Sequence, residues 1–163
     1  MISLLIASSA LQLAAAELKT QAAASDMIDV EADRLDVNKA KGEAVFRGNV
    51  KAVQGNTIIK GATLTLYIDN ASKKIKTMIV EKNVYIKWED KESTCDKAVY
   101  ILDEKKLTLT GNAVVTRGQE KVSGEKILVD MIKDHQVVES GKSGRVKMRV
   151  NSGSESGVLE WKK

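Results

Sequence analysis

Apolar and polar residues alternate along most of this 163-residue chain. The alternation is clear at Val84, Ile86 and Trp88 and again at Leu107 and Leu109, and a side-chain period of two is typical of strands that bury one face. No long segment has the periodicity of an amphipathic helix. Clusters of Gly, Asn, Asp and Lys predict turns between strands of about six to ten residues. The predicted turns are 38–42, 54–56, 69–72, 103–105 and 117–119.

A repeat gives these strands an order. Three glycines and an asparagine return in the same sequence 63 residues further along: Gly48-Asn49, Gly55 and Gly61 become Gly111-Asn112, Gly118 and Gly124. A weaker repeat aligns segments that begin at residues 33, 62, 96 and 125. Units of about 30 residues that need a neighbour to bury their apolar faces predict a stacked, solenoid-like pair of sheets. The fold class is therefore predicted as all-β, an extended antiparallel β-jellyroll.

Small residues occupy several of the predicted inward positions, namely Ala52, Ala62, Ala98 and Ala113. Two sheets about 10 Å apart ordinarily fill the space between them with large side chains. If the sheets splay apart at one side, small residues leave an elongated apolar slot that can accept alkyl chains, at about 0.8 kcal/mol for each buried methylene. The competing interpretation is an ordinary sealed core.

The N-terminal residues predict export. Residues 1–16 carry no charge and end in three alanines before Glu17, which is typical of a secretory signal peptide. This segment is too short to span a membrane, which takes about 20 residues. Residues 17–25 are predicted to be a flexible segment, 26–150 the β-domain and 151–163 a polar, mobile tail. The single Cys95 excludes an internal disulfide, so burial and strand pairing must stabilise the domain.

Four segments resemble the OstA-like family of lipopolysaccharide-transport proteins: 28–33, 46–50, 61–64 and 107–113. The resemblance covers 26–150. It implies a twisted, V-shaped pair of antiparallel sheets that holds lipid A acyl chains of lipopolysaccharide in its interior. A signal peptide before one such domain fits the family's periplasmic member, because the inner-membrane member has an anchor and the outer-membrane member continues into a barrel.

The resemblance also implies partners and lipid-facing residues. Edge strands at 28–35 and 146–150 would join copies end to end as a homo-oligomer, and would dock the inner-membrane transport protein C and the outer-membrane transport protein D. Unpaired edge strands are suited to such strand addition. The family's lipid-facing residues fall on Ile28, Val30, Ile86, Tyr100 and Leu102. Alternation adds Phe46, Val50, Leu64, Leu66, Val84, Leu109, Val115, Ile127 and Val129 as further lining residues.

Other chemistry has weaker support. His135 is the only histidine and lies in a predicted turn at 133–136, Cys95 has no histidine partner in the sequence pattern, and the glycines do not form a G-x-G-x-x-G turn. No enzyme activity, metal or cofactor is therefore predicted. Alternating Arg145, Lys147 and Arg149 could contact nucleic acid, but they lack an aromatic platform. Contact with the phosphate or sugar of a lipid headgroup, or no specific contact at all, is preferred.

Two alternatives remain open. A purely structural β-solenoid of the cell envelope would share the edge-to-edge assembly and lack the lipid. A carbohydrate-active β-helix enzyme would need paired carboxylates across a substrate, and sequence alone does not place two carboxylates in that way.

Overall fold

The computed structural model describes residues 27–142, 144–153 and 157–159. The predicted signal peptide and flexible segment lie outside these residues. The described residues form one ten-stranded antiparallel sheet with a short 3-10 turn, which confirms the predicted all-β class. None of them forms a helix with the length and hydropathy needed to cross a membrane. The elements are β1 (Asp29–Glu31), β2 (Arg34–Asn38), β3 (Glu43–Gln54), β4 (Thr57–Ile68), β5 (Ile75–Trp88), β6 (Lys91–Ile101), β7 (Lys106–Arg117), β8 (Glu120–Asp130), β9 (His135–Glu139), β10 (Lys147–Arg149) and η1 (Gly157–Leu159).

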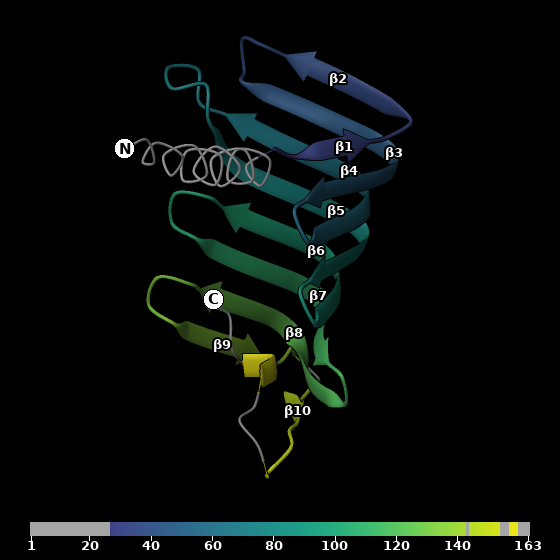
Figure 1. Ribbon diagram of the computed structural model, residues 1–163, viewed down its shortest axis with the longest axis vertical. Coiled ribbons are helices and arrows are strands. Elements are labelled where there is room, and N and C mark those ends of the chain that lie inside the picture. The colour runs from purple at the N-terminus through teal and green to yellow at the C-terminus, as the bar shows by residue number, and fades with distance from the viewer. Residues whose placement is uncertain (1–26, 143, 154–156, 160–163) are drawn as a thin grey trace, which may run out of the picture.

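The long strands β3 to β8 bend near their middles, and the bends fold the sheet into two walls (Figure 1). The strand register shifts at each bend, for example between Arg47 and Val50 and between Thr110 and Ala113. Such β-bulges bend a strand. The two predicted sheets are therefore two halves of one continuous sheet. Wall A consists of β2, 43–47, 63–67, 77–81, 97–101, 106–110, 126–130 and β9, and wall B of β1, 50–54, 57–61, 84–88, 91–95, 113–117, 120–124 and β10.

The repeated Gly-Asn pairs lie at these bends, and their glycines have no room for a side chain. Gly48 and Gly111 both have a φ of 80°, a left-handed conformation that favours glycine. A Cβ atom on Gly111 would lie 2.3 Å from the Asp96 carboxylate, and one on Gly48 would lie 2.2 Å from that of Asp33. Asp96 follows Asp33 by the same 63 residues. The repeat therefore encodes a bend that brings an aspartate against a glycine.

Replacing Gly111 by alanine is expected to lower the free energy of unfolding by about 2 to 3 kcal/mol, because left-handed strain adds to a steric clash. Chemical denaturation followed by circular dichroism measures the loss. Gly118→Ala is the matched control, since its φ is 57° and a Cβ atom there meets nothing within 4 Å. It should cost about 1 kcal/mol. Equal losses in the two variants would show that the clash with Asp96 is unimportant.

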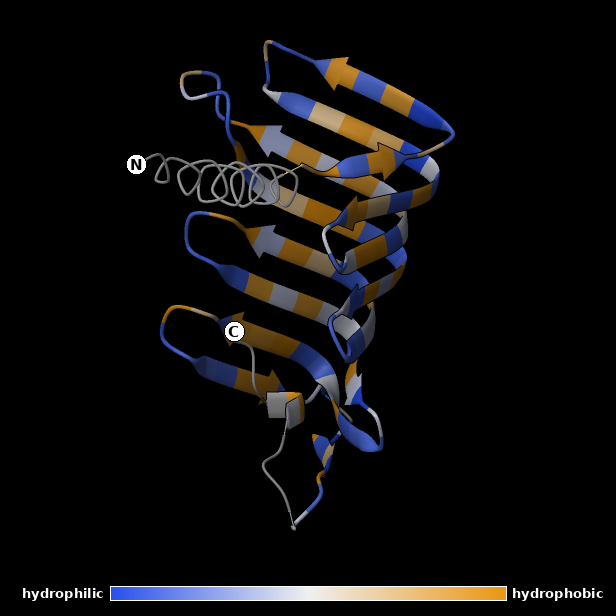
Figure 2. Cartoon of the chain, viewed as in Figure 1, coloured by the Kyte–Doolittle hydropathy of each residue, from blue (hydrophilic) through white to orange (hydrophobic). Residues whose placement is uncertain are grey.

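The core lies between the two walls along the line of bends. Apolar and polar residues alternate along every long strand (Figure 2), so each wall turns its apolar side toward the other. Leu64 and Leu109 are fully buried and Ile127 is 1% exposed. All three belong to wall A, and they share one apolar cluster with Val50, Val84 and Val115 of wall B.

Two short strands complete the sheet at each end. Strands β1 and β2 pair with opposite halves of β3, and β9 and β10 pair with opposite halves of β8. The sequence predicted edge strands at 28–35 and 146–150 and a turn at 133–136. His135 instead begins β9, opposite Asp130. The turn comes earlier than predicted because Asp134 takes the left-handed conformation that closes it, with a φ of 52°.

The described part of the C-terminal tail packs against the sheet. Val158 is 1% exposed and joins the core cluster. The Glu120 carboxylate accepts hydrogen bonds from the backbone N–H groups of Asn151, at 3.2 Å, and Val158, at 3.1 Å. An isolated valine in a polar segment has no periodicity, so the sequence pattern did not mark it as buried.

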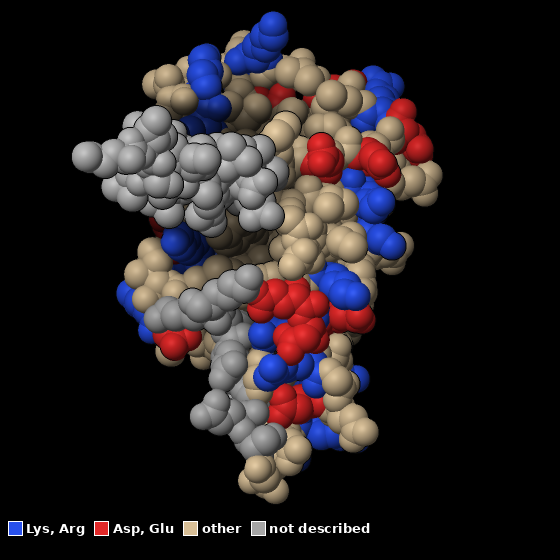
Figure 3. All heavy atoms as spheres, in the orientation of Figure 1, with Lys and Arg blue, Asp and Glu red and all other residues tan. Residues whose placement is uncertain are grey.

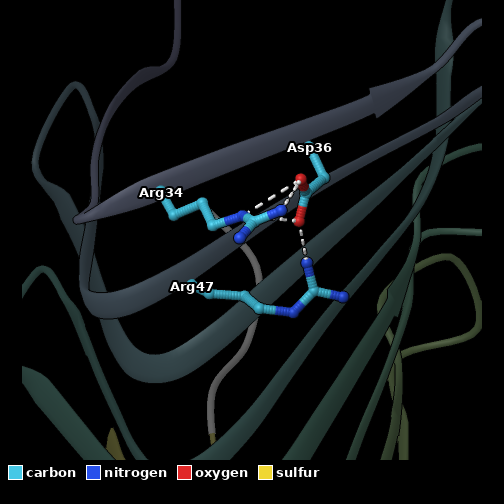
Figure 4. Close-up of polar contacts among 3 residues, drawn as sticks. All are labelled: Arg34, Asp36 and Arg47. Carbon is cyan, nitrogen blue, oxygen red and sulfur yellow. Dashed lines mark hydrogen bonds and ion pairs between the residues drawn. The ribbon is translucent and has the colours of Figure 1, made fainter.

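An ion-pair cluster joins β2 to β3 on the exposed side of the sheet (Figure 4). Arg34 and Arg47 lie directly opposite each other in the register, which places two like charges side by side. Asp36 lies between them, accepts a hydrogen bond of 2.8 Å from Nη2 of Arg34 and pairs with Arg47. The hydrogen bond from Arg34 lowers the pKa of Asp36. The carboxylate therefore offsets the repulsion between the two arginines, so that β2 and β3 can pair.

Replacing Asp36 by asparagine is expected to loosen β2, because the arginines then repel each other without a counter-charge. Hydrogen exchange of the β2 amides should become faster, and added salt should reduce the difference. In the unsubstituted protein the lowered pKa means that this stabilisation is present above about pH 4, the ordinary range of a carboxyl group. It is lost as the pH falls through the folded-state value. Unchanged exchange at low salt would contradict this role.

Candidate functional site

An apolar cavity of about 800 Å³ lies between the two walls. Wall A contributes Met78, Val80, Ala98, Tyr100 and Leu107, and wall B contributes Ala52, Ile59, Ile86 and Trp88. Alternation explains the placement, because residues two apart on one strand share a face. Ala52 and Ala98 are among the small residues expected to leave room, and both line the cavity; Ala62 and Ala113 do not.

The predicted lipid-facing residues divide into three groups. Ile28, Ile86, Tyr100 and Leu102 line the cavity, and Val30 and Phe46 are half-buried against the core. The remaining eight are buried in the core and do not line the cavity: Val50, Leu64, Leu66, Val84, Leu109, Val115, Ile127 and Val129. The first four therefore have the most direct access to a molecule in the cavity. Lipid contact remains a prediction for all fourteen.

Several lining residues were absent from the predicted set. Trp88 lies two residues from Ile86, which had been recognised, so the strand pattern could have identified it. Leu107 likewise shares a face of β7 with Leu109. Ile59 is an odd number of residues before Leu64 and Leu66, and the register shift between Lys60 and Thr63 separates them, so strict alternation does not mark it. Met131 lies in the turn between β8 and β9, where no alternation exists to mark it. Strand periodicity thus identifies the inward face and does not separate a cavity lining from a sealed core.

The mouth of the cavity is polar. Gln54 and Thr57 lie at the open edge of wall B, and Lys73, Lys74 and Asp103 lie at the open edge of wall A. Deeper inside, burial raises the pKa of the Tyr100 hydroxyl, so this phenol is neutral at ordinary pH. An apolar interior with a charged rim matches the chemistry of an amphiphile.

The one cysteine lies in surroundings that suppress its reactivity. Cys95 is buried, and this burial raises the pKa of its thiol to about 11. The nucleophilic thiolate is therefore scarce at neutral pH. Within the described ranges, three or more His, Cys, Asp or Glu side chains do not converge to form a group that could hold a metal ion. The cavity itself is the feature to which a function can be assigned.

The fold and the cavity define an open-sided β-jellyroll with an apolar interior and a polar mouth. The chain belongs to the family described as LptA/(LptD N-terminal domain) LPS transport protein, whose model matches residues 29–135, more than half of the chain. The family is one of transport proteins.

Two individual relatives are similar to this chain at 25% to 29% sequence identity. The lipopolysaccharide export system protein LptH of Pseudomonas aeruginosa is 29% identical over 122 residues, which cover 71% of this chain and 69% of the relative. An uncharacterized protein of Rhizobium meliloti is 25% identical over 112 residues, 64% of this chain and 60% of that protein. This chain therefore spans less than two thirds of the length of the Rhizobium relative.

A solved structure has the same fold. The crystal structure of LptH, the LptA-homologous periplasmic component of the lipopolysaccharide transport device of P. aeruginosa, superposes with a TM-score of 0.68 at 22% identity. The match covers 78% of this chain and 97% of the LptH chain. The predicted jellyroll is confirmed by this agreement.

Proposed function

We propose that this protein carries lipopolysaccharide through the periplasm, with the acyl chains of lipid A in the cavity between the walls. The observation that carries the proposal is the cavity itself, which is apolar inside, charged at its mouth and open at one side of the sheet. Each methylene transferred from water into such a cavity contributes about 0.8 kcal/mol. An open side lets the sugar portion remain in water while the acyl chains are shielded. Carriage of this kind needs no covalent chemistry.

We further propose that copies of the protein stack end to end and bridge the inner and outer membranes, with the inner-membrane protein C and the outer-membrane protein D at the two ends. Two observations support this. Leu35 and Val37 of β2 are exposed at one end of the sheet, and Met148 of β10 is exposed at the other. The backbone of an edge strand can pair with another chain's strand. Strand addition at both ends would also cover the exposed apolar residues.

Site-specific crosslinking tests the carriage of lipid. A photo-reactive amino acid in place of Tyr100 should capture lipopolysaccharide in cells, because Tyr100 lines the cavity. The matched control is the same replacement at Val99, the neighbour whose side chain points to the other face of β6. Capture at 100 and not at 99 is expected. An absence of lipid adducts at 100 would favour a structural scaffold of the envelope instead.

A further inference from the structure

The two open edges of the walls differ in charge. On wall A, the β2–β3 turn (39–42) carries Lys39 and Lys41, and the β4–β5 turn (69–74) carries Lys73 and Lys74. Lys and Arg side chains gather over these two turns in Figure 3. On wall B the three turns read Gly55-Asn56, Glu89-Asp90 and Gly118-Gln119, which include no cation. The part of the wall A edge formed by the β2–β3 and β4–β5 turns is therefore basic, and the facing edge on wall B is neutral or acidic.

The two basic turns form one connected unit. The backbone N–H of Ile68 donates to the carbonyl oxygen of Gly42 at 2.7 Å, and the Asn70 side-chain amide donates to the carbonyl oxygen of Ala40 at 3.3 Å. Within the β4–β5 turn, Asp69 and Lys74 are joined by a backbone hydrogen bond of 2.8 Å. The lysines thus project from a hydrogen-bonded backbone.

The carboxylate in the β4–β5 turn is already engaged, which leaves the two lysines available. Asp69 pairs with Nζ of Lys76 at 2.6 Å and accepts the backbone N–H of Ser72 at 2.7 Å. The hydrogen bond from Lys76 also holds the pKa of Asp69 well below its usual range. Among the described residues, Lys73 and Lys74 have no carboxylate within ion-pair distance, and both line the cavity.

We propose that Lys73 and Lys74 bind the phosphate groups of an amphiphile whose acyl chains occupy the cavity, with Lys39 and Lys41 as the neighbouring phosphate contacts. This inference rests on the proposed lipid carriage and adds an orientation to it: the phosphorylated headgroup faces the edge of wall A. An ammonium group is a point-charge ligand for phosphate, and its attraction is screened by salt. Asp103 lines the same cavity one turn further along and repels phosphate, so it limits the site on that side.

The test compares two lipids that share acyl chains. Binding to the full chain is measured by displacement of a fluorescent fatty acid, with bisphosphorylated lipid A and with the same lipid after its phosphates have been removed. The double variant Lys73→Gln/Lys74→Gln should lose about fivefold in affinity for the phosphorylated lipid, since each exposed charge contact is modest, and should keep its affinity for the dephosphorylated one. Asp103→Asn should bind the phosphorylated lipid more tightly.

Lys105→Gln is the matched control. Lys105 lies in the β6–β7 turn on the same edge and, like Lys73, has a left-handed backbone, with φ values of 48° and 60°. It is exposed and does not line the cavity. Its affinity for both lipids should equal that of the unsubstituted protein. If Lys105→Gln and the double variant lost the same affinity for the phosphorylated lipid, the loss would reflect the net charge of the protein and not a specific phosphate site. That result would overturn the inference.

The remaining outcomes separate this inference from the proposed function. If the unsubstituted protein binds both lipids equally well and the double variant changes neither, the phosphate site is wrong and lipid carriage stands. If it binds neither lipid, both proposals fail. Inorganic phosphate titrated alone tests for a free anion as the ligand. Binding of phosphate with the same dependence on Lys73 and Lys74, at concentrations where lipid A does not bind, would overturn the assignment to a lipid headgroup.

Discussion

Leu109→Ala is expected to lower the free energy of unfolding by about 3 kcal/mol, the loss typical of truncating a fully buried leucine. Leu109 is 0% exposed and lies between Ala98 of β6 and Ile127 of β8 in the strand register. Ala98 is too small to fill the space that the truncated side chain leaves. Urea denaturation followed by circular dichroism measures the change. Because only packing is lost, the slope of the free energy of unfolding against urea concentration should stay the same while the midpoint of unfolding moves to a lower urea concentration.

Leu107→Ala is the informative comparison, since Leu107 lies two residues away on the same face of β7. Leu107 is half-buried and lines the cavity. Its truncation enlarges a space that is already open, so it should cost about 1 kcal/mol or less of stability. The affinity for lipid should fall clearly, while the free energy of unfolding changes little. A stability loss as large as that of Leu109→Ala would show that the cavity is packed as tightly as the core.

Ile86→Asp is expected to lower the affinity for lipopolysaccharide by at least about tenfold, because an acyl chain would have to desolvate a carboxylate in place of contacting an apolar side chain. Ile86 lines the cavity on wall B, opposite Ile59 in the register. Without lipid the cavity is open to water, so the new carboxylate stays hydrated and the fold should persist. Displacement of a fluorescent fatty acid measures the affinity, and circular dichroism checks the fold.

The matched control is Lys87→Asp. Lys87 is the next residue of β5, is exposed and points to the opposite face of the wall. This variant makes a larger change in net charge at almost the same place in the chain. Its lipid affinity should remain within about twofold of the unsubstituted protein, as expected for an exposed charge. Similar losses at 86 and 87 would mean that lipid does not enter between the walls.

Several features of the fold followed from local chemistry. The alternation at Val84, Ile86 and Trp88 predicted a strand with one inward face, and these residues form the second half of strand β5. The pairs Gly48-Asn49 and Gly111-Asn112 predicted a duplicated unit. Their positive φ values show that what is duplicated is a bend. The sequence repeat indicated that these positions are equivalent, and the tertiary structure showed that the bends divide one sheet into two walls.

The candidate site was predicted less completely. Tyr100 and Leu109 have the same pattern of alternation, yet Tyr100 lines the cavity and Leu109 is sealed. The distance between the walls decides which of these occurs, and that distance depends on every bend together. Val158 was missed because a single residue carries no periodicity. The basic edge of the cavity was also missed, because the lysines of two turns become neighbours only when the hairpins pair.

By itself the sequence determined the side-chain period of each strand, the places where the chain must turn and the equivalence of its two halves, since each of these depends on residues close together in the chain. The tertiary structure alone decided where the walls meet and where they part. That separation depends on contacts between strands far apart in sequence, so the same alternating pattern yields a sealed core along the line of bends and an open cavity toward the mouth.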